Sequence, residues 1–327
     1  GESAIEANDG GFITVGYAEP GRFLLKVDQN GVFEFQGFYS SSNPVYLYDI
    51  KSDPSGGYIL SGSSETGPSI IKVDDFGNME WENSVGSEWN TELMRSSVVL
   101  DSGDYVSTGY ITEFGLNAKS IVLLKTDQQG NTVWSKTHWA SNTRNDIPFD
   151  LISTSDGGFA IIGITQKFGS NRVLVVKTDS EGDQEWLKDF DLAPNHDTGR
   201  AIFQTSDEGF LFLSSGGSAS SNAAPWVVKI DKNGEKEWEN AVSIPYDYFY
   251  LTDAIQLSDG GFMCVGYGDT KANGHSGAIV AKLDQSGNRE WIKSFTSGGW
   301  DPAYSISQSS QGTFIISGFS RYLKNND

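Results

Sequence analysis

The sequence predicts an all-β protein, a β-propeller of four-stranded antiparallel blades, because two short units alternate along its 327 residues. The first unit, Lys-x-Asp-x-x-Gly-x-x-x-aromatic, occurs six times between Lys26 and Trp291, at steps of 46 to 53 residues. The second unit is a glycine turn followed by an aromatic-led apolar strand, as in DGGFITVGY from Asp9, and it occurs seven times. A period near 50 predicts one closed domain over 1–327.

Each repeat is expected to hold four strands, A to D. Strand A precedes the glycine turn, and strand B follows it. Strand C ends in Lys-x-Asp, and strand D carries the aromatic residue. Strands B and C are apolar on both faces, as in 159–162 and 173–176, which predicts burial between two neighbouring blades. Strand D alternates more, as in 186–190, which is typical of an outer edge. The Asp-x-x-Gly segment suits a tight turn between C and D.

The blade count depends on the C-terminal part of the chain. Six full repeats run from Ser3 to Phe295, and one further A–B pair follows between Ala303 and Phe319. The sequence therefore favours seven blades with the last one incomplete. Six blades with an additional hairpin is the alternative. A strand preceding Gly1 is one way in which the last blade could be completed.

The aromatic unit resembles the tryptophan-docking repeat of the pyrroloquinoline-quinone-type propellers, in a branch that is not quinoprotein. Lys125 and its equivalents stand where that motif usually has a small residue, and the turn after them is one residue shorter. The resemblance implies the propeller fold with strand A innermost. It implies no quinone cofactor here, since the single cysteine, Cys264, cannot form the paired-cysteine feature of many quinoprotein dehydrogenases. No cofactor is expected.

The composition limits the kinds of partner and the cellular location that can be expected. The net charge is −20, from 43 acidic and 23 basic residues, which argues against nucleic acid. No apolar run approaches the roughly 18 residues of a membrane span. The aromatic, glycine-rich composition suits an exported protein that is extracellular, periplasmic or on the cell surface, with a lipid anchor as an open alternative. The oligomeric state is not predicted.

Comparing the internal repeats separates framework from function. A residue that recurs in every blade is most simply structural, so the recurring aromatic residues are expected to pack blade against blade. The recurring lysine lies two residues before the turn aspartate, on the same strand face. This spacing predicts a repeated structural ion pair, or packing of the lysine stem, rather than a cation site. Function is expected where the blades differ.

The blades differ most in the D–A and B–C loops, which lie together on one face of the disc. Aromatic rings beside carboxylates, amides and an arginine in these loops are suited to stacking on sugar rings and binding hydroxyl groups. Coverage of the blade ends is the alternative role. The candidate ligand-binding residues are Trp89, Trp139, Arg144, Asp146, His196, Asp197, Tyr246, Tyr248, Trp300 and Asp301.

A ring of acidic residues at the start of strand A is a further feature. It could attract a cation in the pore, but carboxylates that end loops at strand entry are favoured. No His/Cys cluster has metal-ligand spacing, so no metal or catalytic residue is assigned. The acidic ring consists of Asp49, Glu92, Asp150, Asp197, Asp253 and Asp301.

The sequence favours a non-enzymatic binding or scaffold protein that recognises glycan or protein through the loop face. The alternative is a polysaccharide-active enzyme, a lyase or glycoside hydrolase, on the same face. That enzyme would need two carboxyl groups about 5–10 Å apart near the pore, or Tyr, His and Arg converging in one pocket.

Overall fold

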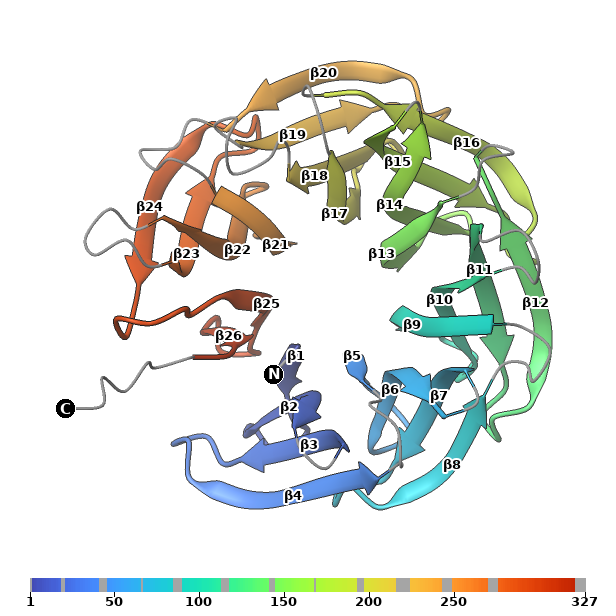
Figure 1. The fold of residues 1–327 in the computed structure, drawn as a ribbon, viewed down its shortest axis with the longest axis vertical. Coiled ribbons are helices and arrows are strands. Elements are labelled where there is room, and N and C mark those ends of the chain that lie inside the picture. The colour runs from blue at the N-terminus through green and yellow to red at the C-terminus, as the bar shows by residue number, and fades with distance from the viewer. Residues whose placement is uncertain are drawn as a thin grey trace.

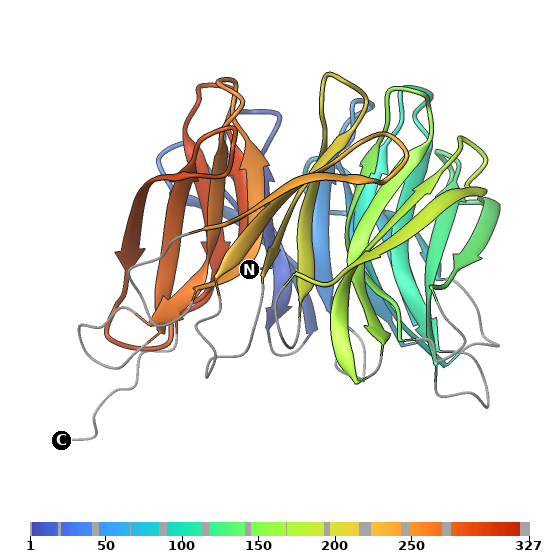
Figure 2. The same ribbon diagram turned by 90° about the horizontal axis from the view of Figure 1, so that it is seen from above.

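The computed structural model shows a ring of small antiparallel sheets around a central channel, seen end-on in Figure 1 and from the side in Figure 2. The prediction of an all-β propeller is confirmed. The structure describes residues 2–18, 21–40, 46–65, 67–84, 90–112, 118–140, 145–167, 169–192, 197–215, 224–242, 249–269 and 276–320.

Six sheets have four strands each, in the order A, B, C, D from the channel outward. The first two blades contain β1 (Ser3–Glu6), β2 (Phe12–Ala18), β3 (Gly21–Val27), β4 (Phe33–Ser40), β5 (Leu47–Ser52), β6 (Tyr58–Ser64), β7 (Gly67–Val73) and β8 (Met79–Ser84). The third and fourth contain β9 (Asn90–Val99), β10 (Tyr105–Thr112), β11 (Lys119–Thr126), β12 (Thr132–His138), β13 (Ile147–Ser153), β14 (Phe159–Lys167), β15 (Ser170–Thr178) and β16 (Gln184–Phe190).

The fifth and sixth blades contain β17 (Thr198–Gln204), β18 (Phe210–Ser215), β19 (Pro225–Ile230), β20 (Lys236–Ala241), β21 (Phe249–Gln256), β22 (Phe262–Asp269), β23 (Ser276–Leu283) and β24 (Arg289–Phe295). A seventh sheet has two strands in the described part of the chain, β25 (Ala303–Gln308) and β26 (Phe314–Gly318). It lies between the sixth and first blades, because β25 contacts both β21 and β1.

The core is divided into clusters that each join two neighbouring blades. One cluster packs Val106 and Leu123 of the third blade against Leu151 and Ile161 of the fourth. All four side chains are buried. Strands B and C therefore bury both faces, as their continuous apolar runs predict.

The recurring aromatic residues dock one blade onto the next. The indole nitrogen of Trp186 donates a hydrogen bond of 3.0 Å to the carbonyl of Lys232, in the C–D turn of the fifth blade. The turn glycine makes room for the ring: a Cβ on Gly234 would lie 3.0 Å from the Trp186 indole. Gly234 also has a φ of +80°, which favours glycine in this turn. Framework packing is thus the observed role of this motif.

The recurring lysines form ion pairs, but not with the aspartate two residues later. Lys177 Nζ lies 2.8 Å from Asp156, which belongs to the glycine turn between strands A and B. Asp179 instead accepts hydrogen bonds from the amides of Glu181 and Asp183 in its own turn. The main chain of the turn already occupies that carboxylate, so the lysine reaches the neighbouring turn. The six pairs are Lys26–Asp9, Lys72–Asp53, Lys125–Asp104, Lys177–Asp156, Lys229–Asp207 and Lys282–Asp259.

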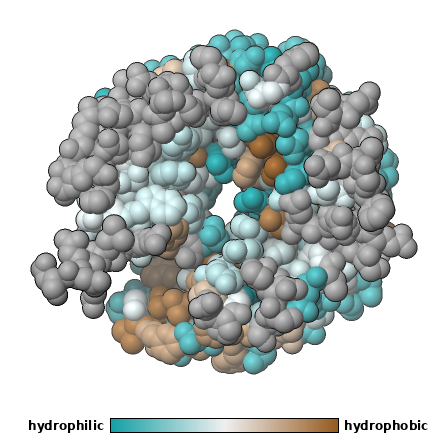
Figure 3. Space-filling view, in the orientation of Figure 1, coloured by the Kyte–Doolittle hydropathy of each residue, from teal (hydrophilic) through white to brown (hydrophobic). Residues whose placement is uncertain are grey.

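Between the sixth and first blades, the two-stranded sheet does not make the docking contact that joins the other blades within the described residues. Trp291 of the sixth blade has no described C–D turn of a seventh blade to dock on, and Lys293 Nζ lies 5.4 Å from its ring centroid. On the other side, a Cβ on Gly31 would meet nothing within 4 Å. Phe33, next to that turn, is 57% exposed. Figure 3 shows hydrophobic residues gathered over this side of the ring, near β2 to β4.

Candidate binding site in the central channel

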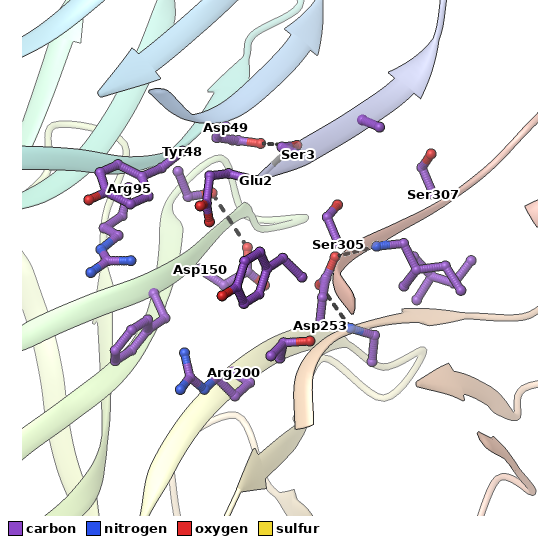
Figure 4. Close-up of a pocket in the computed structure, with 18 of the residues that line it drawn as sticks. Glu2, Ser3, Tyr48, Asp49, Arg95, Asp150, Arg200, Asp253, Ser305 and Ser307 are labelled. Carbon is purple, nitrogen blue, oxygen red and sulfur yellow. Dashed lines mark hydrogen bonds between the residues drawn. The ribbon is translucent and has the colours of Figure 1, made fainter. Parts of the chain in front are cut away.

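The innermost strands of the ring enclose a cavity of about 470 Å³ in the central channel. This volume falls in the range of roughly 300–1,000 Å³ that is common for small-molecule sites. Its walls carry acidic, basic and aromatic side chains from all seven sheets (Figure 4). The opening of the channel is visible in the space-filling view of Figure 3.

A β-bulge in strand A decides which residues face the cavity. In β13, Pro148 pairs with Gly163 and Asp150 pairs with Ile162, so Phe149 is an extra residue. The extra residue breaks the alternation of the strand, and Phe149 and Asp150 therefore both line the cavity although they are adjacent. The same register shift occurs in β5, β9, β17, β21 and β25.

We call the residues at this position the bulge ring. They differ from blade to blade and all line the cavity, and the strand direction places them nearer the D–A loops than the A–B turns. Glu2 holds the matching place just before β1. The bulge ring consists of Glu2, Tyr48, Arg95, Phe149, Arg200, Thr252 and Tyr304.

Three aspartates directly after the bulge, Asp49, Asp150 and Asp253, are the channel carboxylates. Asp253 accepts a 2.8 Å hydrogen bond from the amide of Ala254 and a 2.9 Å hydrogen bond from Ile306 in the next sheet. Asp49 and Asp150 make the same two contacts, to their own strand and to β9 or β17. Each channel carboxylate thus ties two neighbouring innermost strands together.

Two of the channel carboxylates, Asp150 and Asp253, have raised pKa values. Burial raises the pKa of Asp150 to about 6, although Lys51 and the amide of Ile202 oppose the shift. Burial, together with the charge of Asp150, raises the pKa of Asp253 to about 7. Burial alone would lower the pKa of Lys51, but the surrounding aspartates raise it, and Lys51 Nζ lies 3.0 Å from Asp49.

Arg95 and Arg200, which we call the arginine pair, are the bulge residues of the third and fifth blades. The bulge residue of the fourth blade, Phe149, lies between them in chain order. The Cζ atoms of Arg95 and Arg200 are 5.1 Å and 4.4 Å from the ring centroid of Phe149. Arg95 also lies 4.5 Å from the Tyr48 ring. Figure 4 shows both guanidinium groups on the same side of the cavity. Aromatic contacts of this kind hold a guanidinium in place without using its N–H donors.

A chain of aromatic rings leads from the surface to the cavity. Trp300 is 42% exposed, and its ring centroid lies 4.9 Å from that of Phe319. The Phe319 ring lies 5.7 Å from Tyr304, which belongs to the bulge ring. On the other side, Trp300 lies 6.4 Å from Tyr267, which also lines the cavity. Exposed and channel aromatics therefore form one continuous surface.

Half of the predicted loop-face residues can be placed. Trp300 joins the aromatic chain just described. Trp139 is 43% exposed and lines a separate cavity with Lys136 and Asp183, not the channel. Five other predicted residues lie outside the described residues: Trp89, Arg144, His196, Tyr246 and Tyr248.

The remaining three predicted residues, Asp146, Asp197 and Asp301, are buried and accept main-chain hydrogen bonds within their own loops. The donors are the amides of Ala140, Leu192 and Ser297, at 2.6 to 2.7 Å. These aspartates lie four residues before the channel position, so the predicted acidic ring mixes two structural positions. Asp49, Asp150 and Asp253 line the channel, whereas Asp197 and Asp301 cap loops; the side chain of Glu92 is outside the described part.

The sequence reasoning missed the arginine pair and the aromatic members of the bulge ring. A signal was present, because aligning the repeats at strand A brings Tyr48, Arg95, Phe149, Arg200 and Tyr304 into one column. That column varies in residue type from each blade to the next. Variation was expected in the loops, whereas strand A was expected to belong to the framework.

Within the described residues, no group of three or more His, Cys, Asp or Glu side chains is arranged to hold a metal ion. The same residues include no helix long and apolar enough to cross a membrane.

No protein-family model matches the chain, and no curated protein matches it in sequence. Among solved structures, a gluconolactonase from Xanthomonas campestris is 16% identical with a TM-score of 0.45, covering 80% of this chain and 79% of the other. A putative gluconolactonase is 10% identical with a TM-score of 0.46, covering 82% and 84%. A thermostable family-43 glycoside hydrolase is 12% identical with a TM-score of 0.41, covering 68% and 82%.

Similarity this low carries no information about activity. The resemblance to the pyrroloquinoline-quinone-type propellers is not tested by these matches and stays a prediction.

Proposed function

We propose that the protein is a non-enzymatic binding protein that takes up a carbohydrate ligand at the loop-face end of the central channel. The observation that carries this proposal is the chain of aromatic rings from Trp300 through Phe319 to Tyr304. Sugar rings stack on exposed aromatic faces, while channel hydroxyl and carboxylate oxygens accept hydrogen bonds from sugar hydroxyl groups. The predicted site thus moves from the loops alone to the loops together with the channel.

Binding is favoured over catalysis because the channel carboxylates already have structural partners. A general acid or base must reach the reacting group with a free oxygen. Asp150 and Asp253 each accept two main-chain hydrogen bonds that join neighbouring strands. Moving either carboxylate toward a substrate would break those contacts.

A polysaccharide-active enzyme is the second candidate, and a specific observation favours it. Asp150 and Asp253, with pKa values of about 6 and 7, line the same cavity as Lys51. Carboxyl groups that stay protonated near neutral pH are suited to general acid catalysis. Tyrosine and arginine side chains also converge there, although no histidine of the described residues lines the cavity.

A glycan array with labelled protein, followed by calorimetry on the hits, tests the proposal. Trp300→Ala and Tyr304→Ala are expected to weaken binding about tenfold or more, the typical effect of losing a stacked aromatic. Phe76→Ala is the matched control, since Phe76 is 76% exposed in a C–D turn at the other face. A blank array would overturn carbohydrate binding. Glycan turnover that Asp253→Asn abolishes would show that the protein is an enzyme. Capture of a protein through the same residues would show that the ligand is a protein and not a carbohydrate.

A further inference from the structure

The arginine pair interacts electrostatically with acidic side chains, Arg95 with Glu2 and Arg200 with Asp253, but neither guanidinium forms an ion pair with a described residue. The Nε atoms of Arg95 and Arg200 are buried and have no hydrogen-bond partner among the described residues. No described carboxylate lies within ion-pair distance of either guanidinium. The chain has 43 acidic residues against 23 basic ones, so partners are plentiful. Other arginines form ion pairs with acidic residues: Arg22 lies 2.8 Å from Glu82, and Arg172 lies 2.6 Å from Asp191.

Two like charges that face one cavity, with no carboxylate in direct contact, are costly. Burial and the charge of Arg95 lower the pKa of Arg200 to about 10, which reflects the same strain on the charged state. Buried donors without partners cost free energy in the free protein. A ligand that supplies acceptors and negative charge recovers that cost on binding.

We infer that the channel ligand is an acidic sugar, whose carboxylate is bound by Arg95 and Arg200 while its ring hydroxyl groups face the channel carboxylates. This inference rests on the proposed carbohydrate-binding function and specifies the ligand class for the same site. Arginine matches the geometry of a carboxylate with paired N–H donors. Phe149 and Tyr48 hold the guanidinium groups in position, so little side-chain entropy is lost when the ligand binds.

The acceptors beside the arginine pair determine the rest of the ligand. Glu2, Asp150 and Asp253 line the same cavity as the arginine pair. Their oxygens can accept hydrogen bonds from sugar hydroxyl groups. Burial raises the pKa of Glu2, and the charge of Arg95 opposes the shift. One carboxylate and several hydroxyl donors on one ring describe a uronic acid.

Three sugars of similar size show whether affinity comes from a carboxylate, from the neutral sugar ring or from a phosphate. They are glucuronate, glucose and glucose 6-phosphate, each titrated calorimetrically into the whole protein. Glucuronate is expected to bind most tightly, and its affinity should fall as sodium chloride is raised. Arg95→Gln and Arg200→Gln should each weaken glucuronate binding about tenfold to a hundredfold, the range for losing hydrogen bonds to a charged group. Glucose binding should not change. Lys232→Gln, an exposed lysine of a C–D turn, is the matched control.

The outcomes separate the two claims. If glucose binds as tightly as glucuronate, with both lost in Trp300→Ala, the acidic-sugar inference is wrong and carbohydrate binding stands. Preference for glucose 6-phosphate would also overturn the carboxylate assignment. If no probe binds but larger glycans do, titration with oligouronates and neutral oligosaccharides of equal length makes the same decision. If no carbohydrate binds at all, both claims fail. A thermal melt of each variant shows whether it is folded.

Discussion

Two rings of this propeller contrast in how strictly they repeat. The outer ring, formed by the docking aromatics and the C–D turns, has nearly the same residues in six blades, and the aromatic residues of the first four blades pack on the turn glycine of the next blade. The bulge ring around the channel has glutamate, tyrosine, arginine, phenylalanine, arginine, threonine and tyrosine at one structural position. Packing constrains the outer ring, because each blade must fit its neighbour. No such constraint fixes the bulge ring, so its side chains are free to be specialised for a ligand.

The largest effect is expected in the outer ring. Trp186→Ala should destabilise the protein by about 3 kcal/mol, because it removes the ring packed against Gly234 and the hydrogen bond to Lys232. Urea unfolding followed by circular dichroism measures this as a lower midpoint. A change within about 0.5 kcal/mol would break the assignment of this motif to the framework.

The channel carboxylates and the aspartates of the framework turns should also respond oppositely to pH. The raised pKa of Asp253, about 7, means that the folded state holds a proton longer than the unfolded state, whose aspartate pKa is about 3.9. Stability therefore falls as pH rises between about 4 and 7, by at most about 1.4 kcal/mol per pH unit for one group. Asp253→Asn should flatten this slope in urea titrations from pH 5 to 7.5. An unchanged slope would show that another group is responsible.

The framework aspartate Asp207 gives the opposite sign. Hydrogen bonds from Thr205 and Lys229 lower its pKa to about 2. Its contribution to stability is complete above about pH 4 and is lost as the pH falls toward 2. Asp207→Asn should therefore reduce the loss of thermal stability between pH 4 and 2.5, without changing the behaviour between pH 5 and 7.5. A change confined to the higher range would contradict this assignment.

The incomplete seventh sheet supplies an internal control for docking. Trp291→Ala should cost about 1 kcal/mol, clearly less than Trp186→Ala, because Trp291 lacks a described turn to dock on. The same urea titration compares the two variants. Equal losses would mean that burial within its own blade, and not docking on the next, determines the role of the recurring tryptophan.

The smallest effect is expected in the bulge ring. Arg95→Met and Arg200→Met should change stability by no more than about 0.5 kcal/mol, or raise it, because each removes a half-buried charge that has no ion pair and keeps a long side chain. Thermal melts measure this directly. A loss above about 1 kcal/mol would place the arginines in the framework.

The sequence by itself determined the parts of the protein that repeat. The period of the Lys-x-Asp-x-x-Gly-x-x-x-Trp unit predicted the blades, the turns and the docking role of Trp186. Turn formation and the alternation of apolar and polar residues in a strand depend on residues that are close in the sequence. It also predicted the incomplete last blade between Ala303 and Phe319. Even within this framework it assigned the lysine to the wrong aspartate, since the true partner, as in Lys177 and Asp156, lies in the turn between strands A and B.

Only the tertiary structure decided the site. Arg95 and Arg200 are more than 100 residues apart in the chain, and closure of the ring brings both against Phe149. One extra residue in strand A reverses the alternation, so that Phe149 and Asp150 both face the channel. Alternation counted along the strand cannot place both side chains on one face, because the bulge is a property of the pairing between two strands.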